Sequence, residues 1–118
     1  MLDTTEIVVG ILADALDCPV STEIPPQRPD RAATVMLESD AGTDIFFLRP
    51  TYSITCWGLS DIDAKRIAMA AFYALTDAAL THKWLSHVQM DNLTRDLWTG
   101  TGQARYVLTV ETLFNTDE

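Results

Sequence analysis

Two histidines, His82 and His87, carry the side chains best suited to proton transfer or metal binding near neutral pH. A metalloprotease-type zinc site needs two histidines one helical turn apart with a glutamate beside the first, as in H-E-x-x-H. The segment between His82 and His87 is longer than this and contains no carboxylate. We therefore expect both histidines to be ordinary residues of one connecting segment.

Paired carboxylates and glycines also have simpler explanations than catalysis. Asp61 and Asp63 stand at the expected start of a helix, where negative charge interacts favourably with the helix dipole. Gly100 and Gly102 lie between expected strands, so no helix N-terminus follows them to bind a phosphate. The sequence contains no G-x-S-x-G, G-x-x-x-x-G-K-[ST] or G-x-G-x-x-G motif. We predict that the protein is not an enzyme and needs no cofactor or metal.

The two cysteines, Cys18 and Cys56, are far apart in the sequence, and neither has a Cys or His at metal-ligand spacing. We expect buried free thiols, because proteins of a reducing compartment rarely keep disulfides. A disulfide between the two cysteines is the alternative.

Length and composition are those of a single globular domain spanning residues 1–118. Hydrophobic residues make up 47% of the chain and charged residues 21%, which is unlike a disordered protein. No apolar run is long enough to cross a bilayer, and the acidic N-terminus lacks the basic start of a signal peptide. We therefore expect a protein that is made and kept in a cytoplasm, with no membrane partner.

The formal net charge is −9, from 17 acidic and 8 basic residues. A surface of this charge repels phosphates, which argues against direct binding of DNA or RNA. Residues 1–27 contain five acids and no Lys or Arg. The simplest interpretation is a solvated helix face, and the alternative is a wall to which DNA must not adhere.

The elements that position these residues are organised around residues 50–80. Tyr52, Ile54 and Cys56 alternate with Thr, Ser and Trp, which is the pattern of a half-buried strand. From residue 60 to residue 80 apolar residues recur every three or four positions, as in an amphipathic helix. Because only a short turn joins this strand and helix, we expect them to pack together as the core of the fold.

Both expected helices have capping signals at their start. Ser60 can cap the long helix, with Asp63 at the return position of a capping box. A D-x-x-E sequence at residues 3–6 can cap an N-terminal helix over about residues 4–17, which Pro19 must end.

Between the helices the sequence predicts extended segments. A short strand over residues 20–24 leads into a proline-rich stretch at 25–29, which is either a rigid crossover or a docking arm. Residues 33–48 resemble a hairpin with a turn around Gly42. Arg49 and Pro50 then interrupt it, which implies a bulge or a sheet edge.

After the long helix, a connector at residues 81–86 precedes strands expected at 88–94 and 105–114, with a loop at 95–103 between them. Helices segregated from a run of antiparallel strands indicate an α+β fold. We predict an antiparallel or mixed sheet of about five strands packed by two helices.

The three tryptophans have separate expected places. Trp57 ends the central strand and is expected to pack against the helix or a partner, and Trp84 to close the core. Trp98 lies in a Gly- and Thr-rich loop, where an aromatic residue is a candidate interface anchor.

This order of elements resembles the tail terminator (tail completion) proteins of long-tailed phages, especially those of actinobacterial phages and prophages. The motifs that carry the resemblance are the proline–arginine segment at 24–29, Arg49-Pro50 before the central strand, Trp57 at its end, and Arg105-Tyr106 at the start of the last strand. The resemblance covers nearly the whole chain, and it rests on the order and spacing of short motifs.

The resemblance implies a structural virion protein at the tail–neck junction, assembled in the host cytoplasm. Such proteins form a ring, usually hexameric, on the tail tube, stop its polymerisation and present a surface to head-completion proteins. DNA would pass through the bore without specific binding. Arg28, Arg31 and Arg49 would form charge pairs with acidic faces of adjacent subunits. The full set of candidate interface residues is Pro26, Arg28, Pro29, Arg31, Arg49, Trp98 and Arg105.

Two alternatives remain open. A head-closure or head–tail connector protein of the neck has a similar size and also forms rings. A small cytoplasmic ligand-binding or enzymatic α+β domain would instead be a compact monomer with a pocket for a small molecule.

Overall fold

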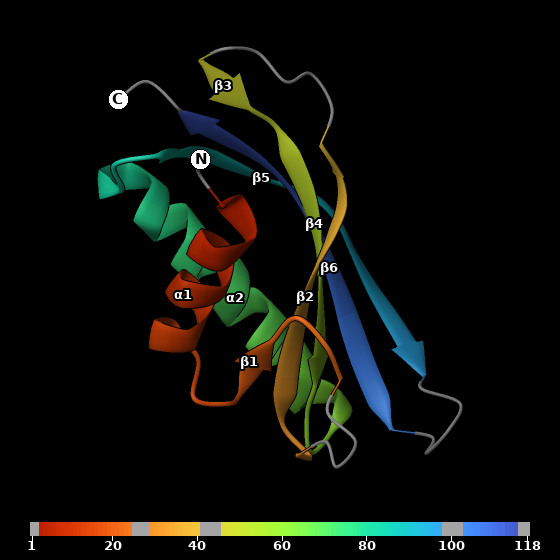
Figure 1. The fold of residues 1–118 in the computed structure, drawn as a ribbon. Coiled ribbons are helices and arrows are strands. Elements are labelled where there is room, and N and C mark those ends of the chain that lie inside the picture. The colour runs from red at the N-terminus through yellow and green to blue at the C-terminus, as the bar shows by residue number, and fades with distance from the viewer. Residues whose placement is uncertain (1–2, 25–28, 41–45, 98–102, 116–118) are drawn as a thin grey trace.

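A computed structural model describes residues 3–24, 29–40, 46–97 and 103–115. It is an α+β fold in which two helices lie on one face of a curled mixed sheet, as the sequence predicted (Figure 1). The elements in chain order are α1 (Thr4–Ala15), β1 (Val20–Ser21), β2 (Ala32–Asp40), β3 (Phe47–Leu48), β4 (Pro50–Trp57), α2 (Asp61–Thr81), β5 (Leu85–Leu97) and β6 (Ala104–Asn115).

Helix α1 begins as predicted and ends earlier. The Asp3 side chain accepts a hydrogen bond from the backbone N–H of Glu6, which satisfies one of the free donors of the first turn. The helix ends at Ala15 rather than residue 17, because Leu16 is already extended while its N–H bonds to Leu12 O. The chain thus leaves the helix before Pro19 requires it to.

Helix α2 has the predicted cap with one difference. Ser60 Oγ accepts a hydrogen bond from Asp63 N at 3.1 Å. The Asp63 carboxylate reaches back to the N–H of Leu59 at 2.9 Å, one residue before the donor used in a capping box. At the other end, His82 Nδ1 accepts from the N–H groups of Trp84 and Leu85, so this imidazole shapes the turn into β5.

The strands are hydrogen-bonded in the order β1-β2-β4-β6-β5, and β3 pairs with the far end of β6. Strand β1 is parallel to β2, and every other pair is antiparallel. Strand β6 therefore lies in the middle of the sheet, although it is the last strand along the chain.

The predicted hairpin over residues 33–48 is wrong in its return strand. Strand β2 pairs with β4, so that Val35 faces Ile54 and Leu37 faces Tyr52. Residues 47–48 pair with β6 instead. The physical reason is burial, because β4 brings three core side chains beside β2, whereas Phe47 is exposed and Leu48 only half-buried.

Arg49 separates β3 from β4, yet the pairing with β6 keeps one register across it, from Leu48–Phe114 to Thr51–Glu111. The irregularity that the sequence placed near Pro50 lies instead in β2, where the register shifts between Leu37 and Ser39. Pro50 pairs with the last residue of β2, where the ladder ends.

Strand β5 is longer than the predicted 88–94, so His87 and residues 95–97 lie in a strand rather than in a connector or loop. Its register against β6 shifts twice, between Leu85 and His87 and between Met90 and Asn92. These bulges bend a long edge strand, which alternation alone does not predict.

The core lies between the helices and the sheet and receives side chains from both helices and four strands. Tyr52, Ile54 and Cys56 all face it, as predicted, and Trp84 packs against its margin. The other fully buried apolar residues of this cluster are Val8, Leu12, Ala33, Val35, Ala68, Ala71, Leu75, Leu85, Leu108, Val110 and Phe114.

Candidate functional site

The face of the sheet turned away from the helices carries many polar side chains. Side chains alternate between the two faces of a sheet along each strand. The residues that alternate with the core residues therefore point to this side. Cross-strand neighbours here are hydroxyl- and amide-bearing, as in the row Ser53–Thr109–Asn92. Thr55 and Thr94 flank Val107 in the next row. These two rows can form many hydrogen bonds while adding little charge.

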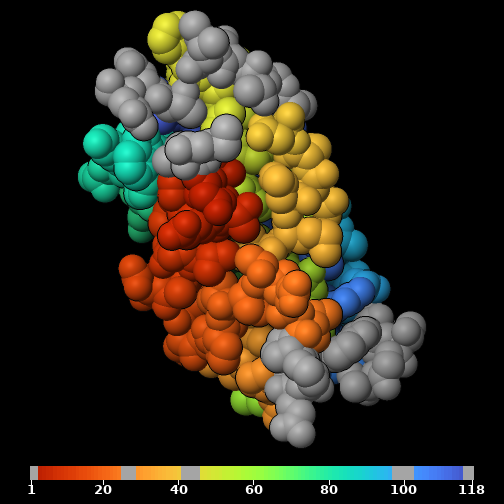
Figure 2. Space-filling view, in the orientation of Figure 1, coloured from red at the N-terminus to blue at the C-terminus, as the bar shows by residue number. Residues whose placement is uncertain are grey.

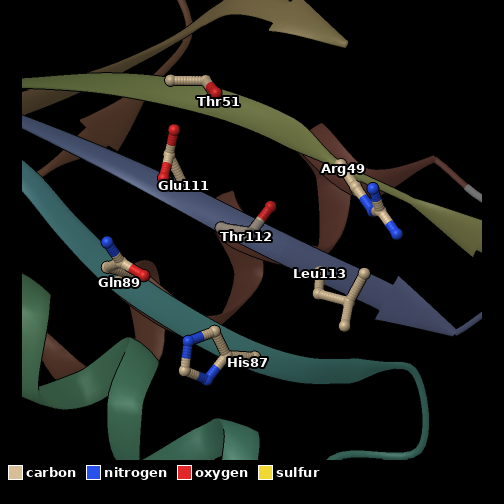
Figure 3. A pocket seen from close by; sticks show the side chains of 7 residues that line it. All are labelled: Arg49, Thr51, His87, Gln89, Glu111, Thr112 and Leu113. Carbon is tan, nitrogen blue, oxygen red and sulfur yellow. The ribbon is translucent and has the colours of Figure 1, made fainter. Parts of the chain in front are cut away.

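A pocket of about 470 Å³ lies at one end of the open face, over β4, β5 and β6 (Figure 3). Thr51, Glu111 and Gln89 form one cross-strand row of its floor. His87 and Leu113 form the next row, and Arg49 projects beside them. The pocket thus offers a guanidinium, an imidazole and a carboxylate over a floor of strands.

Arg49 is the free cation of this pocket. Its side chain is exposed and forms no ion pair with any residue in the described part of the chain. The register of β3 and β4 against β6 holds its backbone in line with the strand, so the guanidinium can reach a carboxylate from outside the chain. The predicted role of Arg49 in binding a partner remains a prediction, and its position is consistent with it.

Arg31, in contrast, is used within the chain. Its Nε and Nη2 donate to the two carboxylate oxygens of Asp63 at 2.9 and 3.2 Å, and Nη1 lies 3.1 Å from Asp17 Oδ1. The hydrogen bonds from Arg31 hold the pKa of the Asp63 carboxyl below its usual range. Arg31 therefore ties the end of α1 and the start of α2 together.

Arg105 is also paired inside the sheet. Its Nη2 lies 2.8 Å from Asp96 Oδ2 on the neighbouring strand, and its guanidinium lies 6.0 Å from the ring centre of Trp57. Trp57 is buried on the open face rather than against the helices. Arg95 pairs similarly with Asp61 at 2.6 Å, which raises the pKa of the arginine.

Of the remaining predicted interface residues, only one lies within the part of the chain that the structure describes. Pro29 is exposed, just before the segment that leads into β2. Pro26, Arg28 and Trp98 lie outside the described residues.

The sheet also has two edges without a strand partner among the described residues. Strand β1 pairs only with Ala33 and Thr34, which leaves the outer side of residues 35–40 uncovered. Met36 and Leu37 point to opposite faces there, and both are largely exposed. The other edge is the outer side of β5. Exposed strand edges are templates for pairing with another chain.

Chemistry is sparse elsewhere in the described chain. No group of three or more His, Cys, Asp or Glu side chains converges there as a metal site requires. Both cysteines are free thiols, and burial raises the pKa of Cys56 to about 12, which makes it a poor nucleophile. No helix in the described ranges is long and apolar enough to cross a membrane.

No protein-family model and no curated protein matches this sequence.

One structural residue gave no signal in the sequence. Gln103 Nε2 donates to Asp30 O at 2.9 Å and to Gly58 O at 2.8 Å. It thereby joins the start of β6 to the approach to β2 and to the turn before α2. A glutamine between two strands has no spacing or motif that announces such a contact.

Proposed function

We propose that this chain is a structural virion protein, the tail terminator of a long-tailed phage. It forms a ring on the end of the tail tube, stops tube polymerisation and presents a surface for head attachment. The observation that carries the proposal is the pair of free edges, at β2 and β5, on opposite sides of one sheet. The short motifs described above are the basis for proposing the tail terminator family.

The directions of the two edges favour a ring. Strands β2, β4, β6 and β5 are antiparallel to one another in turn, so β2 and β5 run in opposite directions. A second copy turned about an axis along the strands can set its β2 beside β5 of the first as an antiparallel ladder. Such a contact uses different surfaces on each copy, and it closes into a ring when the rotation divides a full turn. The resemblance implies six copies.

Charge supports passage of DNA through such a ring. The net charge of −9 repels phosphates, and hydroxyls and amides form the middle rows of the open sheet face. Of the arginines on this face, Arg105 is paired with Asp96, and Arg49 shares its pocket with Glu111. DNA would not adhere to a bore lined by acidic residues, nor to one lined by these hydroxyls and amides. Reversal of bore acids should slow genome ejection, and unchanged ejection through fully assembled rings would contradict this role.

Addition of the purified protein to polymerising tail-tube subunits tests the proposal. We expect shorter tubes, each ending in a ring visible by electron microscopy. Leu37→Lys places a charge on the free edge of β2, where the side chain is 46% exposed, and should abolish capping without loss of thermal stability. Leu59→Lys, at a side chain that is 70% exposed and away from both edges, is the matched control. Tubes that grow unhindered in the presence of the wild-type protein would refute the proposal.

The same experiment addresses the alternatives. A head-closure or connector protein would form rings that bind capsid portals and leave tube growth unchanged. The pocket beside Arg49 favours the ligand-binding domain as the remaining candidate. A strict monomer stabilised by a small molecule, with that effect lost in Arg49→Ala, would establish it.

A further inference from the structure

The outward face of α2 has an apolar line where an amphipathic helix normally shows polar residues. Ile62, Tyr73 and Leu80 are exposed to 72%, 59% and 80% of their surface, and Met69 on the same line is half-buried. The line extends over about 27 Å at the 1.5 Å rise of an α-helix. Large apolar side chains gathered along one line of a surface mark an interaction site.

The spacing of this line is that of a helix-pairing seam. The positions 62, 66, 69, 73, 76 and 80 alternate steps of four and three, which is the spacing of the two inner positions of a heptad. Four of these positions hold Ile62, Met69, Tyr73 and Leu80, and the other two hold Arg66 and Thr76. At roughly 100° per residue, all six lie within about 40° of one direction. The buried residues Ala64, Ala68 and Ala71 lie on the opposite side of the helix. One helix thus has two apolar faces, and only one of them meets the core.

Helix α1 does not cover the seam. It lies beside α2 on the same face of the sheet (Figure 1), and a groove between them is lined by Ala15 at the end of α1, by Leu16 just after it, and by Arg66, Ile67 and Ala70 of α2. These residues place α1 on one flank of α2. The end of α2 and the following turn project beyond α1 in the space-filling view, at the left of Figure 2.

Arg66, at one of these six positions, and Asp77, beside them, identify the orientation of a partner helix. Arg66 and Asp77 lie on the same flank and are exposed. Neither is in a salt bridge among the residues that the structure describes, although Arg66 is near enough to Asp63 to help lower the pKa of that carboxyl. Arg66 and Asp77 are nearly equidistant from the middle of the seam. A twofold axis at that point brings Arg66 of each copy beside Asp77 of the other, and it sets Ile62 opposite Leu80.

A parallel arrangement has the opposite consequence. Each residue then meets its own equivalent, so the two Arg66 side chains face each other inside the contact, and burial of like charges is costly. The pattern is self-complementary only in the antiparallel sense.

We propose that α2 binds α2 of a second copy of this chain, antiparallel, through the seam formed by Ile62, Met69, Tyr73 and Leu80. This interface goes beyond the proposed ring and uses neither the β2 nor the β5 edge.

Oligomeric mass tests the proposal directly. The measurement uses the edge variant Leu37→Lys, so that ring assembly does not contribute. Light scattering should give twice the chain mass of 13.1 kDa at high concentration. Tyr73→Glu should weaken the dimer at least about tenfold, because it buries an unpaired carboxylate. Ile24→Glu, at an exposed apolar side chain near β1 and away from α2, should not weaken it, and circular dichroism checks that each variant is folded. A monomer at every concentration, or a Tyr73→Glu dimer as stable as its parent, would overturn the proposal.

Orientation is tested by cross-linking in a Cys18→Ser background with a short bismaleimide. A mixture of Ile62→Cys and Leu80→Cys should cross-link, whereas either variant alone should not. Cross-linking of Ile62→Cys with itself indicates a parallel seam and refutes the antiparallel one. In the same way, Arg66→Asp should weaken the dimer, and addition of Asp77→Arg to that chain should restore it.

Discussion

Arg31 and Asp63 form a two-point contact, with Nε to Oδ2 at 2.9 Å and Nη2 to Oδ1 at 3.2 Å. Asp63 also accepts from the N–H of Leu59, so one carboxylate both anchors the arginine and closes the turn before α2. Arg31 binds Asp17 as well and therefore connects both helices to the segment before β2. A cation that the sequence assigned to a neighbouring subunit thus has partners within its own chain.

This contact predicts a pH dependence of stability. The pKa of Asp63 in the folded protein lies below the unfolded value of about 3.9, chiefly because of its hydrogen bonds from Arg31. The stabilisation is therefore present above that unfolded value and is lost as pH falls through the lower folded pKa. Asp63→Asn should lower the melting temperature at pH 7 and make no difference in strong acid. Asp14→Asn, on the exposed face of α1, is the control, and an equal deficit at every pH would contradict the linkage.

Tyr52 links the start of α1 to β4. Its hydroxyl forms hydrogen bonds with Thr4 Oγ1 at 2.5 Å and Thr5 Oγ1 at 3.0 Å. Tyr52→Phe should lower the free energy of unfolding by about 1 kcal/mol and speed amide exchange in the first turn of α1. Tyr106→Phe removes a hydroxyl from a half-buried ring without this contact and should change neither measurement.

The two glycines at positions 10 and 58 should respond to alanine in opposite directions. A Cβ on Gly58 would overlap Ala64 N and lie 2.8 Å from Ala64 Cα, because the turn passes directly under the first turn of α2. Gly58→Ala should destabilise the fold by about 1–3 kcal/mol. A Cβ on Gly10 meets nothing within 4 Å, so Gly10→Ala should stabilise by about 0.5–1 kcal/mol through helix propensity. Denaturant unfolding of both variants measures the difference.

Substitution of Arg49 should affect binding to a partner without affecting the stability of the fold. Because its guanidinium has no ion pair with the described residues, Arg49→Glu should leave the melting temperature unchanged and still weaken ring formation or tube capping. Lys65→Glu makes the same charge change on the outer surface of α2 and should leave capping intact. A loss of stability in Arg49→Glu would show instead that the residue supports the fold.

The helices were the most predictable part of the fold, because their signals are local. Ser60 and the Asp3–Glu6 pair both cap as their spacing indicates. The strands 50–57 and 104–115 were also predictable, because each alternates over a long stretch. Pairing was less accessible, since it depends on which distant strand offers the better apolar neighbour, and the return strand after β2 was assigned wrongly for this reason.

The candidate site was predictable only in part. The composition of the chain indicated a protein with little chemistry, and the resemblance named Arg49 as an interface candidate, which stays a prediction. The pocket was not foreseen, because Gln89 and Glu111 come together only through the pairing of β5 with β6. The roles of Arg31 and Arg105 could not be separated from that of Arg49 for the same reason, since an ion pair between distant residues leaves no periodic pattern.

The central place of β6 has a consequence for biosynthesis. Ile54 in β4 pairs with Leu108 in β6, so β4 leaves the ribosome long before its inner neighbour has been made. During that interval the nascent chain holds a strand rich in buried residues with one side unpaired. The sheet is completed when β6, the last strand to be made, pairs with β4 and β5. Pairing between residues that are distant in sequence makes folding slow. A chain that is stalled or cut before β6 should therefore remain a client of chaperones rather than a partly functional subunit.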